Sequence, residues 1–368
     1  MEVVVLQEDI LKGLMSVSRF VSTRVQLPIL SNILIVADKN TLRLAATNLE
    51  MGISYKLGAK IEEEGAITIP SKVISELMSN LPAGKVRLKA DKGQLTVTSN
   101  SSSANLSGIS ASEFPEVPET AEKIDFTINK EILDTINKQV VFSASRDDSR
   151  PILSGVLFSI NQDGLRAVST DGFRLSCKDI QKNKKIDMDQ TVLMPARLIE
   201  EVAKLISNSE EEIGVSVLDG EKQLIFTTST ATLTGRLIEG DFPDYKRIIP
   251  KSTTITARFS KDDLVRAVKI TSVIARESSG VVRLKIEKDK LTVFTENPSF
   301  GCQEASLDAK VEGGEVETAF NYKYLLEFLN SATGSEIVFS TNGSTASGVF
   351  KDSTDESYLH LIMPIRVQ

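Results

Sequence analysis

Residues that carry enzyme chemistry are scarce in this chain, whose 368 residues include one histidine, two cysteines and no tryptophan. His360 has no cysteine or acid at the spacing of a catalytic triad or a metal site, so we expect it to be structural. Cys177 and Cys302 predict neither a disulfide framework nor a metal site, and we expect both to be buried or half-buried. No glycine-rich phosphate-binding motif follows a strand-like segment. The sequence therefore predicts a non-catalytic protein with no cofactor and no metal.

Long apolar runs are missing as well. No run approaches the roughly 18 apolar residues that a membrane-spanning helix needs, and the start MEVVVLQEDI lacks the regions of a signal peptide. We therefore expect a cytoplasmic protein. Acidic residues outnumber basic ones by 50 to 43, so the chain as a whole should repel nucleic acid. Net charge does not tell how the two signs are distributed.

One unit occurs three times in the chain, with a period about the length of a domain. Each copy opens with a helix-like segment, and these openings align Leu11, Leu133 and Leu264. Paired strand-like segments follow, namely ILIVADKNTLRLAAT, VLFSINQDGLRAVST and RLKIEKDKLTVFT. A second helix-like stretch comes next, namely IPSKVISELMSNL, MPARLIEEVAKLI and AFNYKYLLEFLNSA. The strand segments place three threonines at equivalent positions, Thr47, Thr170 and Thr295.

Periodicity within the copies predicts both strands and helices. Apolar and polar residues alternate on both sides of Asp91-Lys92-Gly93, which is typical of a half-buried hairpin. We expect the counterpart turns at Asp219-Gly220 and Asn342-Gly343, because such dipeptides tolerate positive φ. The opening helix has apolar residues at 3.6-residue spacing between Ile10 and Val21. The predicted fold is α+β, with three repeated domains that each lay two amphipathic helices on one face of antiparallel sheet.

Two short segments separate the copies. Ser112 to Lys123 contains two prolines among acidic residues, and Pro243 to Thr253 is the second such connection. The predicted domains are therefore residues 1–120, 128–246 and 247–368. Short connections between similar domains favour a rigid curved row.

Five motifs in order resemble one known family. LPILSNILI, RPILSGVLF, TDGFRLS, FPDYKRIIP and the terminal MPIRV, on a triplicated chain of this size, are similar to the beta sliding clamp, the processivity subunit of the bacterial DNA polymerase III holoenzyme. The resemblance implies a homodimer that closes head to tail into a ring of six similar domains, with the helices lining the hole. It implies no enzyme activity of its own, although the family is catalogued with the DNA-directed DNA polymerase holoenzyme.

Basic residues mark the expected DNA-binding surface. Lys72, Arg197 and Lys323 stand at corresponding places in the second helix of each copy, which suggests a lined surface. The resemblance adds Arg24, in the loop before LPIL, and Arg146, in the loop before RPIL. An acid at position 147 departs from the polar residue of the family. We expect ring closure to retain duplex DNA without sequence readout.

The resemblance also implies a hydrophobic cleft between the second and third domains that accepts short peptides from the polymerase, the clamp loader and repair proteins. The family often has histidine where Phe173 stands and an aromatic residue where Ser279 aligns, so the rim of the cleft differs here. Met363 and the apolar positions suit aliphatic or aromatic anchors, and the arginines suit peptide carbonyls or acids. The matching positions are Leu153, Thr170, Gly172, Phe173, Arg174, Leu175, Pro243, Arg247, Ile248, Asn321, Tyr324, Ser347, Leu361, Ile362, Met363, Pro364, Ile365 and Arg366.

For the dimer contact, the resemblance points to a strand around Ala104 and Leu106 that meets the helix end around Val273 and Ile274. The alternative is that these four apolar residues belong to the cores of their own domains. The sequence also leaves two other functions open. An enzyme subunit acting on nucleotides would need a metal-binding acid cluster, and an adaptor that does not bind DNA would need no basic residues in register on its helices.

Overall fold

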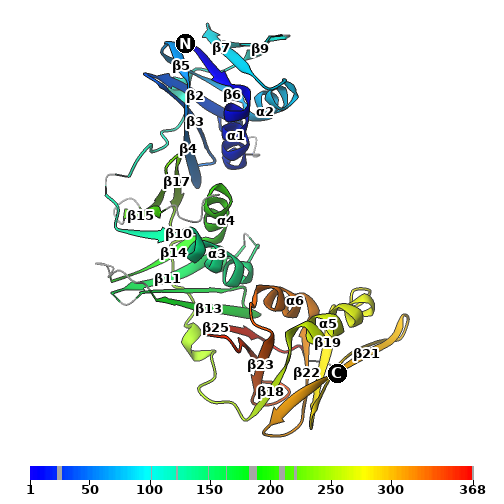
Figure 1. The fold of residues 1–368 in the computed structure, drawn as a ribbon. Coiled ribbons are helices and arrows are strands. Elements are labelled where there is room, and N and C mark those ends of the chain that lie inside the picture. Colours follow the sequence, from blue (N-terminus) through cyan, green and yellow to red (C-terminus); the bar gives the residue numbers. More distant parts are fainter. Residues whose placement is uncertain are drawn as a thin grey trace. The chain divides into compact units, whose positions relative to one another are not determined.

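The computed structural model describes residues 1–22, 27–100, 102–121, 123–147, 149–162, 164–181, 189–206, 212–218 and 222–366. These residues form two compact units, residues 1–130 with 201–237 and residues 131–200 with 238–368. Figure 1 shows strands and helices recurring along the chain, with six α-helices among the described residues. None of those helices combines the length and apolar character that a membrane span requires.

The first unit contains two antiparallel sheets. One has the strand order β5-β1-β7-β8-β9, and the other has the order β10-β15-β16-β17-β4-β3-β2-β6. Helices α1 (Gln7–Val17) and α2 (Ser71–Asn80) pack against each other. The strands are β1 (Glu2–Leu6), β2 (Asn32–Asp38), β3 (Thr41–Thr47), β4 (Met51–Gly58), β5 (Lys60–Glu63), β6 (Gly65–Pro70), β7 (Lys85–Asp91), β8 (Gln94–Thr98), β9 (Ser103–Ser107), β10 (Phe126–Asn129), β15 (Glu212–Leu218), β16 (Gln223–Thr227) and β17 (Ala231–Arg236).

The second unit is built on one sheet of order β14-β11-β12-β13-β25-β24-β23-β18-β21-β20-β19-β22. Its helices are α3 (Lys130–Gln139), α5 (Lys261–Ala275) and α6 (Tyr322–Ser331), while α4 (Ala196–Leu205) begins in this unit and ends in the first. The strands are β11 (Gly155–Asn161), β12 (Gly164–Thr170), β13 (Arg174–Gln181), β14 (Gln190–Pro195), β18 (Ile255–Ser260), β19 (Val281–Glu287), β20 (Lys290–Asn297), β21 (Gly301–Glu312), β22 (Val316–Asn321), β23 (Glu336–Thr341), β24 (Gly348–Asp352) and β25 (Asp355–Ile362).

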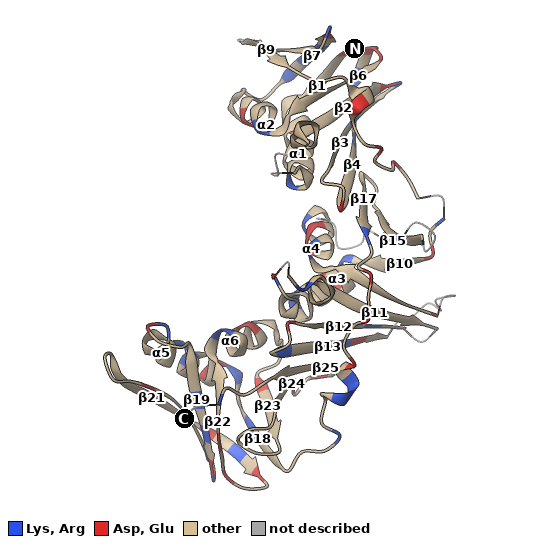
Figure 2. Ribbon diagram, turned by 180° about the vertical axis from the view of Figure 1, so that it is seen from behind, with Lys and Arg blue, Asp and Glu red and all other residues tan. Residues whose placement is uncertain are grey.

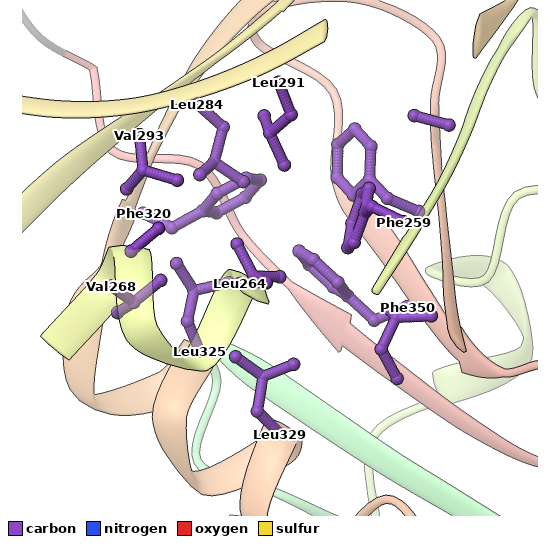
Figure 3. Packing of buried hydrophobic residues seen from close by; sticks show 14 of the residues in the cluster. Phe259, Leu264, Val268, Leu284, Leu291, Val293, Phe320, Leu325, Leu329 and Phe350 are labelled. Carbon is purple, nitrogen blue, oxygen red and sulfur yellow. The ribbon is translucent and has the colours of Figure 1, made fainter. Parts of the chain in front are cut away.

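The core of the third copy shows why these residues fold locally as they do (Figure 3). Leu264 and Val268 are four residues apart on α5, and Leu325 and Leu329 repeat that spacing on α6, so each helix buries one face. Alternate residues of β19 and β20 meet them from the sheet. Burying one such side chain stabilises the fold by about 1.5–3 kcal/mol.

Neighbouring copies are joined by strand pairing. In the first unit, β4 of the first copy pairs antiparallel with β17 of the second, with Ile53 opposite Leu233. In the second unit, β13 of the second copy pairs antiparallel with β25 of the third, with Cys177 opposite Leu359. The sheets therefore continue across both boundaries between copies, and a pairing between equivalent strands is used twice.

Both connections between copies pack on sheet. Val117 of the first connection is buried with Leu34 and Ala45. Tyr245 of the second is buried with Val349 and Leu361, next to Cys177. Burial of a side chain from each connection supports the expectation that neither behaves as a flexible linker.

Three local predictions meet the structure with different outcomes. The Lys92-Gly93 turn is tight, with φ of 46° and 77°, but Asn342-Gly343 lies in a loop of residues 342–347. The prediction of a tight turn at Asn342-Gly343 was wrong, because the Asn342 amide bonds across the loop to the Thr254 N–H (2.9 Å) and the Ser252 carbonyl (2.9 Å). Asp219-Gly220 lies outside the described residues.

The prediction for cysteine is half correct, because Cys177 is buried whereas Cys302 is exposed on β21.

Candidate functional site

The loop between β12 and β13 is an Asx turn. The Asp171 carboxylate accepts the backbone N–H groups of Phe173 (2.9 Å) and Arg174 (3.0 Å). The Thr170 hydroxyl donates to the Arg174 carbonyl (2.6 Å) and accepts the Gly172 N–H (3.1 Å). Gly172 has φ of +92°, which favours glycine, and the turn leaves Phe173 with 59% of its surface exposed.

Arg174 follows the turn and is only 7% exposed. Its guanidinium donates to Asp171 (3.0 Å), to Glu327 on α6 and to the Phe142 carbonyl (2.7 Å). The same group lies over the rings of Tyr324 (4.4 Å) and Phe142 (5.2 Å). A buried cation is therefore fully partnered at the point where the second copy meets the third.

The C-terminal segment crosses this junction. The Met363 N–H donates to the Phe173 carbonyl (2.8 Å), and two residues later the Ile365 N–H donates to the Ala319 carbonyl of β22 (2.8 Å). Beside this segment lies a cavity of about 530 Å³, which includes Met363, Ile365 and Arg283 in its lining. Exposed apolar side chains therefore border a hollow.

The predicted cleft residues divide into an exposed group and a buried group. Phe173, Ile248 (40% exposed), Met363 (43%) and Ile365 (36%) offer apolar surface. Leu175 and Leu361 are instead buried under the second connection, and Ile362 is buried in the core of the third copy. The buried group supports the surface but does not offer contact area to a ligand.

The remaining predicted cleft positions differ in exposure and in partners. The Asn321 side chain caps α6 by accepting the Lys323 N–H (2.9 Å), and Arg247 pairs with Asp244 (2.7 Å). Leu153, Tyr324, Ser347 and Pro364 are half-buried, while Pro243, Arg247 and Arg366 are exposed.

His360 lies beneath the same junction and is completely buried. Its Nδ1 bonds the Ser176 hydroxyl (2.8 Å), which in turn bonds Ser143 (2.8 Å), and its ring stacks on Phe328 (5.2 Å, 13°). Burial, and to a lesser degree the nearby charge of Arg174, hold the pKa of His360 well below its usual range. Those contacts make it a neutral structural residue, as the sequence suggested.

The basic residues expected to face DNA share one position in their helices. Lys72, Arg197 and Lys323 are each the second residue of α2, α4 and α6, and all three are exposed. Figure 2 shows basic positions on these three helices. Arg146 is exposed, and neighbouring Asp147 is held by the Ser149 N–H (3.0 Å), a bond that lowers the pKa of Asp147. Arg24 lies outside the described residues.

Among the strand edges that lack a ladder partner in the described part of the chain, those of β9 and β21 bear on the expected dimer contact. β9, which carries Ala104 and Leu106, pairs only with β8. β21 pairs with β20 along residues 301–308, and it pairs with β18 only along residues 309–312. Residues 301–308 of β21 therefore have one edge without a partner strand among the described residues. At the end of α5, Val273 is 61% exposed and Ile274 is half-buried. Of the four residues expected at the dimer contact, none is a fully buried core residue.

Comparison with known proteins identifies the family. The sequence matches the DNA polymerase III beta subunit, with the N-terminal domain at residues 1–118, the central domain at 127–244 and the C-terminal domain at 246–366. The chain belongs to the beta sliding clamp family. It is similar over the full length of both chains to the beta sliding clamps of Proteus mirabilis (29% identical) and of a Synechocystis strain (28%). It therefore confers processivity on DNA polymerase III and is not itself catalytic.

Solved structures agree. The DNA polymerase sliding clamp of Bacillus subtilis has a TM-score of 0.95 at 25% identity, and both chains are covered completely. A sliding clamp from Pseudomonas aeruginosa, solved bound to griselimycin, has a TM-score of 0.92 at 27% identity with the same coverage. The fold therefore comprises three clamp domains of antiparallel sheet and six described helices.

Sequence reasoning missed Glu327 and Phe142, which complete the contacts of Arg174. From the sequence, Glu327 is an ordinary acid on the solvent face of an amphipathic helix. It lies next to Arg174 because β13 of the second copy pairs with β25 of the third. In the described residues, no group of three or more histidine, cysteine or acidic side chains could hold a metal ion.

Proposed function

We propose that two copies of this clamp close head to tail into a ring around duplex DNA in the cytoplasm, and that the surface around Met363 tethers replication proteins to it. The proposed ring uses the three domains at residues 1–120, 128–246 and 247–368 of each copy. The repeated strand junction is the observation that carries this proposal.

Each copy presents one strand to the next copy. β4 of the first copy pairs with β17 of the second, and β13 of the second copy pairs with β25 of the third. In the order of elements, β21 of the third copy corresponds to β4 and β13, and β9 of the first copy corresponds to β17 and β25. In a ring, β21 of one chain would therefore pair with β9 of another. Both strands have an edge left unpaired among the described residues, as do the strands β5, β6, β10, β14 and β22 at the other sheet ends. A second chain placed head to tail would pair both edges and leave no open end.

The predicted contact residues suit this arrangement. When Leu133 and Leu264 are aligned, Val273 takes the place of Phe142, whose ring contacts His360 of β25 (5.4 Å) at an internal junction. Val273 and Ile274 would likewise meet β9 of the partner copy, near Ala104 and Leu106. Burying an exposed valine there would contribute about 1–2 kcal/mol per junction.

The starts of α2, α4 and α6 support the DNA-binding proposal. The first turn of a helix carries a partial positive charge, which attracts phosphate. Lys72, Arg197 and Lys323 add a cation at the same place in each domain. Arg24 and Arg146 would extend this set from the loops before LPIL and RPIL. A DNA-binding surface with few cations and no motif that reads bases would favour sliding over sequence-specific binding.

Retention by topology can be tested directly. The clamp is loaded by a clamp loader onto nicked circular DNA or onto the same DNA made linear, and both are washed at high salt. A ring should stay on the circle and slide off the linear ends, because screening weakens the ionic contacts but does not open the ring. Equal loss from both DNAs would contradict the proposal.

The partner surface is proposed to take short apolar peptides from the polymerase, the clamp loader and repair proteins. Exposed Met363 and Ile365, which line a cavity, support this role, and exposed Phe173 and Ile248 add apolar surface outside the lining of that cavity. The griselimycin complex of the Pseudomonas aeruginosa clamp shows that a relative binds a ligand, which adds support.

Met363→Ala tests the peptide surface. The variant should weaken binding of a fluorescein-labelled peptide from the polymerase of the same organism about tenfold, since apolar anchors dominate such surfaces. Met15→Ala is the matched control, because Met15 is 62% exposed on α1 and lies outside the proposed cleft. Equal affinity for the two variants would contradict the assignment.

A further inference from the structure

We propose that Glu327 is a positioning residue for partner binding, and that it acts by holding Arg174 in place as the fixed support of the cleft. This inference rests on the proposed partner cleft. It gives Arg174 a supporting role in place of direct contact with the peptide, and it assigns a role to an acid on a different domain.

Arg174 has little capacity left for a ligand. Its side chain is 8% exposed, and its nitrogens already donate to Asp171, Glu327 and the Phe142 carbonyl. Withdrawing a donor from Asp171 or from the Phe142 carbonyl would leave a partly buried acceptor without its partner, and leaving a buried acceptor unsatisfied typically costs about 1–3 kcal/mol. A hydrogen bond from Arg174 to a peptide carbonyl would be no stronger than the hydrogen bond that it would replace.

The groups attached to Arg174 belong to segments that carry the proposed cleft residues. Asp171 fixes the turn that exposes Phe173, and the Phe173 carbonyl in turn accepts the Met363 N–H (2.8 Å). Tyr324 stacks on the guanidinium at 4.4 Å. Arg174 thus links the turn to helix α6, and the turn bonds the C-terminal segment through Phe173. The relative placement of these segments would set where Phe173 and Met363 stand in the proposed cleft.

The first junction shows that this cation is not needed to pair the strands. There Met51 stands where Arg174 stands, and it is 4% exposed. Asn48 accepts the N–H groups of Glu50 (3.0 Å) and Met51 (2.7 Å), and the Glu50 carbonyl accepts the Arg236 N–H (2.9 Å). The same hydrogen bonds form at the first junction without a buried charge. Strand pairing therefore does not explain why the second junction has an arginine.

Glu327 is the member of the cluster that can be changed with least damage. Its side chain is 47% exposed, whereas that of Asp171 is 14% exposed and also holds the turn. Removing Glu327 takes away one anchor of Arg174 and leaves the Asx turn and the strand ladder in place. The free energy of unfolding should therefore change little, while the Arg174 side chain becomes less fixed.

The experiment compares Glu327→Ala, Glu327→Gln and a control, Glu336→Ala. Glu336 is a matched acid, 42% exposed and 3.8 Å from Arg258. The probe is the same labelled polymerase peptide. We expect about tenfold weaker binding for Glu327→Ala, about threefold for Glu327→Gln, which keeps the acceptor but loses the charge, and no change for the control. The dimer mass should stay the same in all three.

A second readout separates positioning from general damage. Amide hydrogen exchange without peptide should speed up at Phe173 and Arg174 in Glu327→Ala, while the urea midpoint stays within error of the wild-type value. If Glu327→Ala binds like the control while Met363→Ala binds weakly, the role of Glu327 is wrong and the cleft stands. If the wild-type clamp does not bind the peptide, or if Met363→Ala binds as tightly as the wild type, the cleft and this inference both fall.

Discussion

The loop before β4 and the loop before β13 use the same backbone hydrogen bonds with different side chains. Thr47 donates to the Met51 carbonyl (3.0 Å) as Thr170 donates to the Arg174 carbonyl (2.6 Å). Leu49 holds a φ of 73° where Gly172 holds 92°. Because the turn is repeated, its hydrogen bonds account for the shared strand junction. The surface properties of the two junctions differ through the side chains at three equivalent positions, Leu49/Gly172, Glu50/Phe173 and Met51/Arg174.

The third equivalent threonine differs. Thr295 donates to the Val281 carbonyl (3.1 Å), because β20 continues to Asn297 before the chain turns into β21. The third copy has no following copy in its own chain. Its loop and its presenting strand are therefore the parts that the proposed partner chain would complete.

The largest effect is expected when the charge is moved to the first junction. Met51→Arg should destabilise the protein by about 4 kcal/mol or more, because Met51 is 4% exposed and Asn48 is no anion. Urea denaturation followed by circular dichroism measures the change. A loss below about 1 kcal/mol would show that the first site accepts a cation and that the two junctions are equivalent.

The reverse exchange should also be costly but repairable. Arg174→Met should lose about 2–4 kcal/mol, since it leaves Asp171, Glu327 and the Phe142 carbonyl without their shared donor. Adding Asp171→Asn recreates the Asn48 and Met51 pair of the first junction, and it should restore about half of that loss. A double variant that is less stable than Arg174→Met would contradict the comparison.

Acid should weaken the second junction selectively. Because burial lowers the pKa of His360, the unfolded chain binds a proton below pH about 6.5 that the folded chain does not, so stability falls with falling pH. Below pH about 6.5 the slope should approach about 1.4 kcal/mol per pH unit, the value for one proton. His360→Asn should flatten this slope while lowering stability overall, and urea midpoints across this range measure both. An unchanged slope would contradict the assignment.

The smallest effects are expected at the tips of the two turns. Gly172→Leu should cost about 1–2 kcal/mol because φ of +92° strains any residue with a Cβ. Leu49→Gly should change stability by less than about 1 kcal/mol, because relief of strain opposes the greater flexibility of unfolded glycine. Melting temperatures compare the pair. A larger loss for Leu49→Gly would mean that the Leu49 side chain has a packing role.

The repeat and the helices could be predicted from the sequence, because both rest on local periodicity. The expected stretch at 194–206 contains α4 (Ala196–Leu205), and Lys72, Arg197 and Lys323 do fall at one helical position. The contacts of Arg174 with Glu327 and the Phe142 carbonyl could not be predicted, since they depend on segments far apart in the chain. The exposure of Cys302 was not predicted either. No local pattern distinguishes Glu327 from an ordinary solvated acid.

Solution mass is the most direct measure of ring closure, because the proposed ring requires β21 of each chain to meet β9 of another. Sedimentation at micromolar concentration should give twice 40.2 kDa for the wild-type chain and for Val73→Asp, which alters an exposed valine on α2. Val273→Asp should give 40.2 kDa with unchanged circular dichroism, because a charge would be buried at each junction. A monomeric wild-type chain, or a Val273→Asp variant that remains dimeric, would contradict the account.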